Sequence, residues 1–203
     1  MSNCEIVLPI INPRNYLRVI VNIQNALQAS GQVWIDKIYG EARIRETRIE
    51  GRLEKSLVTI AQEGEIELIT FDDSLKSSCF FVIKDPKMIS FSAKDTDISS
   101  FDMSIIFFVN LASIDTTMKF YYENIIIEQL MRILEFTPRK EQAYFDVKRF
   151  YNSNPKSVLS DFYSPNMIEK MNLVYPNTCF RIDLNCVCAL DCDPTFVFDN
   201  TLC

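Results

Sequence analysis

Four cysteines near the C-terminus are the residues whose type and spacing come closest to a metal site. They follow the pattern C-x6-C-x-C-x3-C: Cys179, Cys186, Cys188 and Cys192. Structural zinc sites usually take two thiolates from one tight turn, because the chain must curl to supply two corners of a tetrahedron. Cys186 and Cys188 fall two apart in a strand-like stretch, so they share a face without enclosing a point. We therefore expect buried thiols that act as small apolar groups, and no metal ligands.

The rest of the chain offers little to catalysis. Histidine is absent, which excludes Ser-His and Cys-His nucleophiles and leaves carboxylate, lysine or thiolate chemistry. The 4 glycines form neither GxGxxG nor GxxxxGK[ST], so we expect no phosphate-binding loop and no cofactor. The acidic pairs Asp72/Asp73 and Asp95/Asp97 could bind a divalent cation, but Asp72-Asp73-Ser74 is ordinary turn chemistry. We expect no catalytic residue and no enzyme.

Composition sets the broad class of the protein. With 203 residues, 48% of them hydrophobic and 24% charged, the chain can form a single domain over 1–203 with a sizeable core. The net charge of −6 argues against a general nucleic-acid binder, which needs a basic face to displace counterions from phosphates. No signal peptide and no apolar run of bilayer length stands out, so we expect a soluble protein with reduced cysteines and no membrane contact.

Residues 41–56 form the most unusual segment of the chain. Five cations alternate there with four glutamates: Arg43, Arg45, Arg48, Arg52 and Lys55 against Glu41, Glu46, Glu50 and Glu54. One interpretation is a solvated helix or hairpin laced by ion pairs. The other is a protruding arm that contacts a partner subunit, where arginine is favoured for bidentate pairing. DNA contact is disfavoured because the glutamates cancel the positive field.

The elements that would position these residues follow from hydrophobic periodicity. Residues 103–111 form a nearly uncharged β-branched and aromatic run, typical of a strand buried on both faces, and a helix over 118–136 follows with a cap among Asp115, Thr116 and Thr117. A period-two pattern over 180–188 predicts a half-buried strand whose outer face carries Arg181, Asp183 and Asn185. The remaining expected elements are a helix over 13–30, strands at 33–39, 57–60, 65–70 and 78–83, a polar loop over 86–101, and short helices at 156–162 and 165–171.

This order of elements predicts an α+β fold, a mostly antiparallel sheet with helices packed on one face. The segments 1–12 and 193–203 are apolar, contain proline, and are expected to be extended terminal arms. The first could be an edge strand of its own domain or could dock on a neighbouring subunit. The second could be a last strand or an end that settles on a partner.

The pattern resembles the tail-terminator and tail-completion proteins of tailed bacteriophages, especially those of phages with Bacteroides-type hosts. Four stretches carry the resemblance: Pro13–Ser30, Gly64-Glu65-Ile66 through Asp72-Asp73-Ser74 to Cys79-Phe80-Phe81, Ser104–Leu111, and Tyr175–Leu184. It covers most of the chain as an order of elements rather than as a tight motif. The charged segment 41–56 is additional to the compact core of that family.

The resemblance implies a structural virion protein of the phage neck or tail, assembled in the host cytoplasm. Such proteins form closed rings of identical subunits between the portal and the tail, contact portal, neck and tail proteins, and surround DNA without binding it specifically. The arginines of 41–56 would then belong to a partner interface, with a tail-terminator-like fold around them. Two other classes stay open: an intracellular adaptor that binds one protein without catalysis, and a carboxylate-dependent enzyme such as a metal-dependent nuclease.

Overall fold

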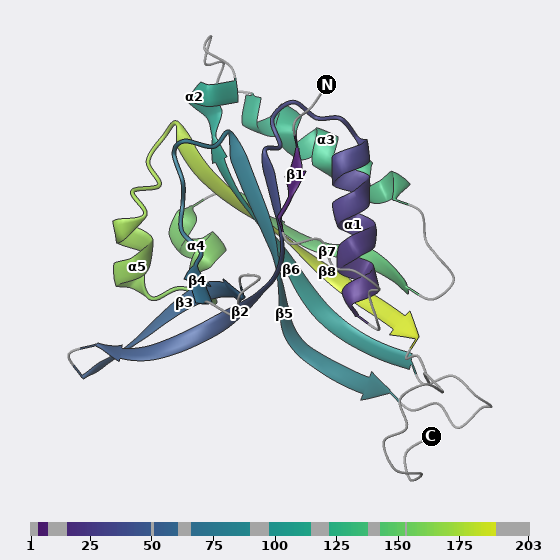
Figure 1. Ribbon diagram of the computed structural model, residues 1–203, viewed down its shortest axis with the longest axis horizontal. Helices are drawn as coiled ribbons and strands as arrows, with labels where there is room; N and C mark the ends of the chain where they lie inside the picture. The colour runs from purple at the N-terminus through teal and green to yellow at the C-terminus, as the bar shows by residue number, and fades with distance from the viewer. Residues whose placement is uncertain are drawn as a thin grey trace.

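The computed structural model describes residues 4–7, 16–49, 51–60, 66–89, 98–114, 122–137, 143–152 and 154–189 (Figure 1). The fold is α+β, with a twisted, mostly antiparallel sheet in the order β4-β3-β2-β5-β6-β8-β7 and β1 beside β2. The strands are β1 Glu5–Ile6, β2 Lys37–Ile49, β3 Arg52–Ile60, β4 Ile66–Leu68, β5 Ser77–Ile89, β6 Ile98–Asn110, β7 Ala143–Tyr151 and β8 Asn177–Ala189. The helices are α1 Leu17–Ala29, α2 Leu111–Ile114, α3 Tyr122–Phe136, α4 Pro155–Leu159 and α5 Pro165–Lys170.

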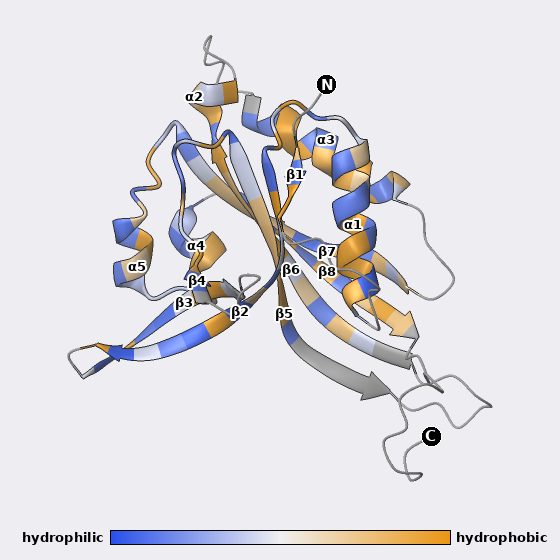
Figure 2. Ribbon diagram, viewed as in Figure 1, coloured by the Kyte–Doolittle hydropathy of each residue, from blue (hydrophilic) through white to orange (hydrophobic). Residues whose placement is uncertain are grey.

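The sheet separates two hydrophobic clusters because its central strands are apolar on both faces. On β6, Phe107 belongs to the cluster under α1 and α3, whereas its neighbours Ile106 and Phe108 belong to the cluster under α4 and α5. Successive side chains of a strand point to opposite faces, so an uninterrupted apolar run needs a cover on each. The prediction of helices on one face is therefore wrong: α1 and α3 cover one face, and α4 and α5 cover the other. Figure 2 shows hydrophobic positions on the helices of both layers.

Several predicted elements are confirmed, with shifted ends. The helix expected over 13–30 is α1, with Val19, Ile20, Ile23 and Leu27 buried, and the two short helices are α4 and α5. The helix expected over 118–136 is described from Tyr122, preceded by the separate short helix α2. The capping residues proposed at 115–117 lie outside the described residues.

Other boundaries were wrong. The strand expected at 33–39 begins at Lys37 and continues through the charged segment to Ile49. The predicted loop over 86–101 is partly strand, because β5 runs to Ile89 past a register shift before Pro86, and β6 begins at Ile98. Strand β7 forms where no element was predicted.

The described part of the N-terminal arm lies against its own chain. Glu5 and Ile6 pair in parallel with Lys37 and Ile38 of β2. The rest of 1–12, apart from Cys4 and Val7, and the whole of 193–203 lie outside the described residues.

Candidate assembly interface

The charged segment 41–56 forms a β-hairpin whose outer end lies away from the body of the molecule. The inner half of β2 pairs with β1 and β5 as far as Ala42, and from Arg43 to Ile49 its only strand partner among the described residues is β3. The sheet therefore narrows to two strands, and this ribbon extends to the left extreme of Figure 1. The first interpretation of this segment allowed a helix or a hairpin, and the hairpin is the one that forms.

This hairpin is held by bonds to two other parts of the chain, the start of α5 and the residue just before α1. The backbone N–H of Ser164, just before α5, donates to the carbonyl of Lys55 at 3.0 Å. The side-chain amide of Asn166 donates to Glu54 Oε1 at 3.5 Å. Tyr16, just before α1, donates from its hydroxyl to Glu41 Oε2 at 3.3 Å. The ribbon is thus held at Glu41 on β2 and at Glu54 and Lys55 on β3, which reduces the ordering cost of any contact that its outer end makes.

Strand register places the five predicted interface cations on both faces of the ribbon. Residues directly opposite each other in an antiparallel pair share a face. Arg45 lies opposite Ser56 and Ile49 opposite Arg52, so Arg43, Arg45 and Arg52 lie on one face with Ile49. Arg48 lies opposite Leu53 and Glu46 opposite Lys55, which puts Arg48 and Lys55 on the other face with Ile44 and Leu53. Each face therefore carries both positive charge and aliphatic surface.

Only two of these five cations have a carboxylate partner among the described residues. Arg43 Nε lies 3.1 Å from Glu41 Oε1, and Lys55 Nζ lies 3.6 Å from Glu46 Oε1. Arg45, Arg48 and Arg52 are exposed and make no ion pair with any residue that the structure describes. Between them Ile44, Ile49 and Leu53 are 43%, 50% and 53% exposed. Unpaired arginine beside exposed aliphatic side chains is the composition expected of a protein–protein contact.

A buried arginine forms the main polar cluster of the core, and the sequence pattern did not identify it. Arg181 was placed on the wet face of β8, yet it is only 2% exposed because α4 and the turn after it cover that face. Its Nε and Nη2 donate to the two oxygens of Asp183 at 2.8 and 3.1 Å. Its Nη1 donates to Asp161 Oδ2 at 2.8 Å and to the carbonyl of Val158 at 3.1 Å. The signal that could have found it is the short helix pair over 156–171, which needs a sheet face to cover.

Aromatic rings and further polar groups complete the cluster. The Arg181 guanidinium lies 4.1 Å from the ring centre of Tyr151 and 5.1 Å from that of Phe162. Asp183 also accepts a 2.6 Å bond from the Ser104 hydroxyl, and Lys84 lies 3.4 Å from Asp161 and 3.6 Å from Asp183. Burial alone would raise the pKa of Asp161, but Arg181 and Lys84 outweigh it and the pKa is lowered. Burial would likewise lower the pKa of Arg181, but its two carboxylates raise it.

This cluster fastens α4 to the sheet, and its polar atoms are already engaged in bonds within the protein. Both oxygens of Asp183 and the donors of Arg181 already have partners inside the protein. A cavity of about 290 Å³ adjoins it, and its wall includes the cations Lys84, Lys148 and Arg149 and the carboxylates Asp102 and Asp183. Lys148 is paired with Asp102 at 3.1 Å and Lys84 with Asp183 at 3.6 Å, and the Arg149 guanidinium lies 4.6 Å from the Tyr151 ring centre. We therefore interpret this buried ion pair, whose polar atoms bond to one another, as a structural element of the core.

The described cysteines of the C-terminal pattern do not converge on a point. Cys186 and Cys188 face the cluster under α1 and α3, as the period-two pattern predicts, whereas Cys179 lies in the opposite cluster. Burial raises the pKa of Cys179 to about 12 and raises that of Cys186 further. Cys192 lies outside the described residues, and no group of three potential metal ligands occurs among those described.

The acidic pair Asp72/Asp73 is a turn, as predicted. Asp72 Oδ1 accepts bonds from the Ser74 backbone N–H at 3.0 Å and from the Ser74 hydroxyl at 2.6 Å. These bonds from Ser74 lower the pKa of Asp72. Asp95 and Asp97 lie outside the described residues.

Comparison with known proteins gives no family for this chain. No protein-family model matches it, and no curated protein matches it significantly. In the described part of the chain no helix has the length and apolarity that crossing a membrane requires.

Proposed function

We propose that this protein is a non-catalytic assembly subunit that joins copies of itself into a ring through the hairpin of β2 and β3. The observation that carries the proposal is the outer end of this hairpin. It is anchored at its root, and it exposes three arginines without described partners beside three aliphatic side chains. Among the described residues these arginines make no ion pair and these aliphatic side chains stay exposed, so this surface can contact another chain.

The setting proposed for this ring is the neck or tail of a tailed bacteriophage, in accord with the resemblance of the sequence to tail-terminator and tail-completion proteins. A subunit in that position would contact portal or other neck and tail proteins and would surround the passing DNA. The net charge of −6 supports a channel wall that repels DNA rather than binding it. The hairpin would then be the addition that distinguishes this chain from the compact family core.

A reversal of charge on the hairpin tests the proposal. Purified wild-type protein, examined by light scattering and negative-stain microscopy over roughly 1–100 μM, should form discrete oligomers. The variant Arg48→Glu/Arg52→Glu should shift them toward single subunits. The matched control is Lys156→Glu/Lys170→Glu, which makes the same change in net charge on α4 and α5 and should assemble normally.

Two results would refute the assembly proposal. One is a wild-type protein that stays a single subunit at every concentration and binds no neck or tail protein. The other is a hairpin variant that assembles as the wild type does. A single subunit that nevertheless captures one defined cellular protein through the hairpin would support the adaptor function instead.

A further inference from the structure

Strand β4 stands at one end of the sheet order, beside the hairpin strands β3 and β2, and strand β7 stands at the other end. Among the described residues β7 pairs only with β8, and no backbone hydrogen bond joins its outer edge to another described segment. A strand edge of this kind presents N–H and C=O groups that can pair with a further strand. Native proteins usually shield such edges, so an open one next to apolar surface indicates a contact site.

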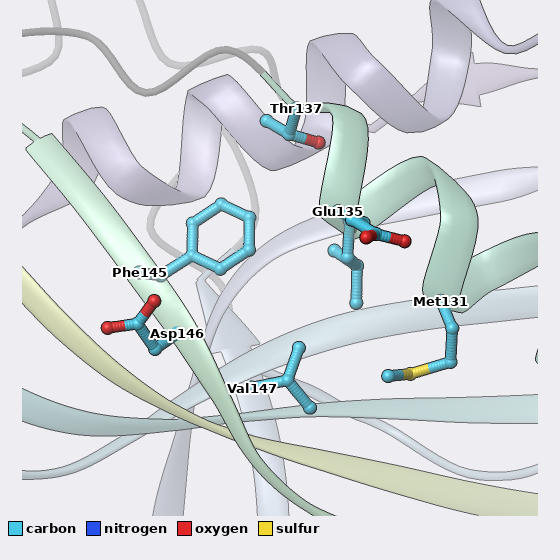
Figure 3. Close-up of a pocket in the computed structure, with 7 residues that line it drawn as sticks. Met131, Glu135, Thr137, Phe145, Asp146 and Val147 are labelled. Atoms are coloured by element: carbon cyan, nitrogen blue, oxygen red, sulfur yellow. The ribbon is translucent and has the colours of Figure 1, made fainter.

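A groove runs along this edge, between β7 and the C-terminal half of α3 (Figure 3). Its volume is about 250 Å³, and its walls are Met131, Leu134, Glu135, Thr137, Phe145, Asp146 and Val147. In Figure 3 Phe145 and Val147 point from the strand toward the helix, and Met131 points from the helix toward the strand. Val147 lies on the core side of β7, two residues from buried Phe145, yet it is 37% exposed. The core is thus incompletely covered at this place.

The helix side of the groove adds a negative charge and a large apolar group. Glu135 is exposed, and within the described residues it makes no ion pair. Phe136, the last residue of α3, is 79% exposed. The groove therefore combines an apolar floor, a carboxylate at its rim and an open strand edge.

We propose that this groove receives the hairpin of a second copy of the chain. In this contact the edge of β2 that faces away from β3, between Arg43 and Ile49, pairs with the free edge of β7. This inference rests on the proposed assembly function and names the surface that the hairpin meets. From Arg43 to Ile49 this edge of β2 has no strand partner among the described residues, because the pairing with β5 ends at Ala42. The aliphatic side chains of the hairpin match the groove floor, and its exposed arginines, which have no ion-pair partner among the described residues, match Glu135.

The alternative pairings of identical surfaces are less favourable. Two hairpins facing each other would bring their exposed arginines together, and like charges placed across a strand pair are destabilising. A contact between a hairpin and a groove joins two different surfaces of the subunit. Such heterologous contacts continue from copy to copy and give a closed ring when the rotation between neighbours closes. This geometry accords with a ring subunit.

Substitutions on the two faces of β7 test the docking site. Val147→Arg places charge in the groove, and Tyr144→Arg is the matched control on the opposite face of the same strand, where Tyr144 is 42% exposed. We expect Val147→Arg to weaken self-association by about tenfold or more, the size of effect that a central interface residue has, and Tyr144→Arg to weaken it far less. Far-UV circular dichroism and the urea midpoint establish that each variant is folded.

Mixing two defective variants then tests whether the hairpin of one subunit docks in the groove of another. A Val147→Arg subunit keeps an intact hairpin, and an Arg48→Glu/Arg52→Glu subunit keeps an intact groove. An equimolar mixture should therefore give dimers that cannot grow, seen by light scattering and native mass spectrometry. Normal assembly of Val147→Arg alone, or a mixture that forms no dimers, overturns the docking site. The hairpin proposal itself fails only if the hairpin variant alone still assembles or the wild type does not.

Discussion

Replacing Arg181 should be among the most damaging single changes in this chain, although nothing in its local sequence marks it. The side chain is 3% exposed, and it donates to Asp183 through two atoms and to Asp161 and Val158 through a third. Arg181→Met removes the donors and leaves the Asp183 side chain, which is 15% exposed, without its main counter-charge. Breaking a buried pair by removing one partner costs about 3–5 kcal/mol of unfolding free energy, since a charge stays buried without compensation.

Three companion variants separate charge, geometry and packing. Arg181→Lys keeps the charge but loses the planar fork, so we expect an intermediate loss of about 1–3 kcal/mol. Arg181→Met/Asp183→Asn removes both charges and should regain part of the loss of Arg181→Met. Lys148→Met is the control, because its 3.1 Å pair with Asp102 has side chains that are 58% and 48% exposed. An exposed pair of this kind contributes about 0–1 kcal/mol.

The assay is urea unfolding followed by far-UV circular dichroism and by the fluorescence of Trp34. Trp34 is the only tryptophan, it is 2% exposed, and its Nε1–H donates to Gln129 Oε1 at 2.8 Å. Its emission therefore reports the packing of the cluster under α1 and α3, on the far side of the sheet from Arg181. Coincident curves from the two probes would show that the free energies refer to global unfolding. A loss for Arg181→Met no larger than that for Lys148→Met would refute the reasoning.

Two further predictions concern ionisation. The pKa of Asp161 is lowered in the folded protein, so its contribution to stability is present above the unfolded pKa and is lost as pH falls through the folded pKa. Asp161→Asn should therefore be less stable than the wild type near neutral pH and nearly equal to it at strongly acidic pH. Urea titrations at stepped pH values measure this difference. A constant difference across that range would contradict this sign. Burial raises the pKa values of the Cys79 and Cys186 thiols, so both should resist alkylation at pH 8 in the folded protein and react after unfolding in urea, as mapped by peptide mass spectrometry. Rapid labelling of either in the native protein would show that its strand opens readily.

Some features of this protein follow from sequence alone, because they depend on neighbours in the chain. The period-two pattern of β8 correctly places Phe180, Ile182, Leu184, Cys186 and Cys188 in one buried cluster. The uncharged run of β6 correctly predicts a strand with both faces buried, and Asp72-Asp73-Ser74 correctly predicts a turn. In each case the relevant residues lie within one element, so hydrophobic periodicity or turn-forming side chains report it directly.

Tertiary structure decided the features that depend on what packs against an element. In the sequence, Arg181 occupies a polar position of an alternating strand pattern, as an exposed strand residue would. It is buried only because α4 and the turn at Asp161 dock over it. The same holds for β7, whose mixed sequence becomes a strand by pairing with β8, and for the extension of β2, whose charged residues are held in a ribbon by β3. The groove beside Val147 likewise exists only because α3 ends above an edge strand. Such pairings join residues far apart in the chain, and their energies come from contacts that no local spacing records.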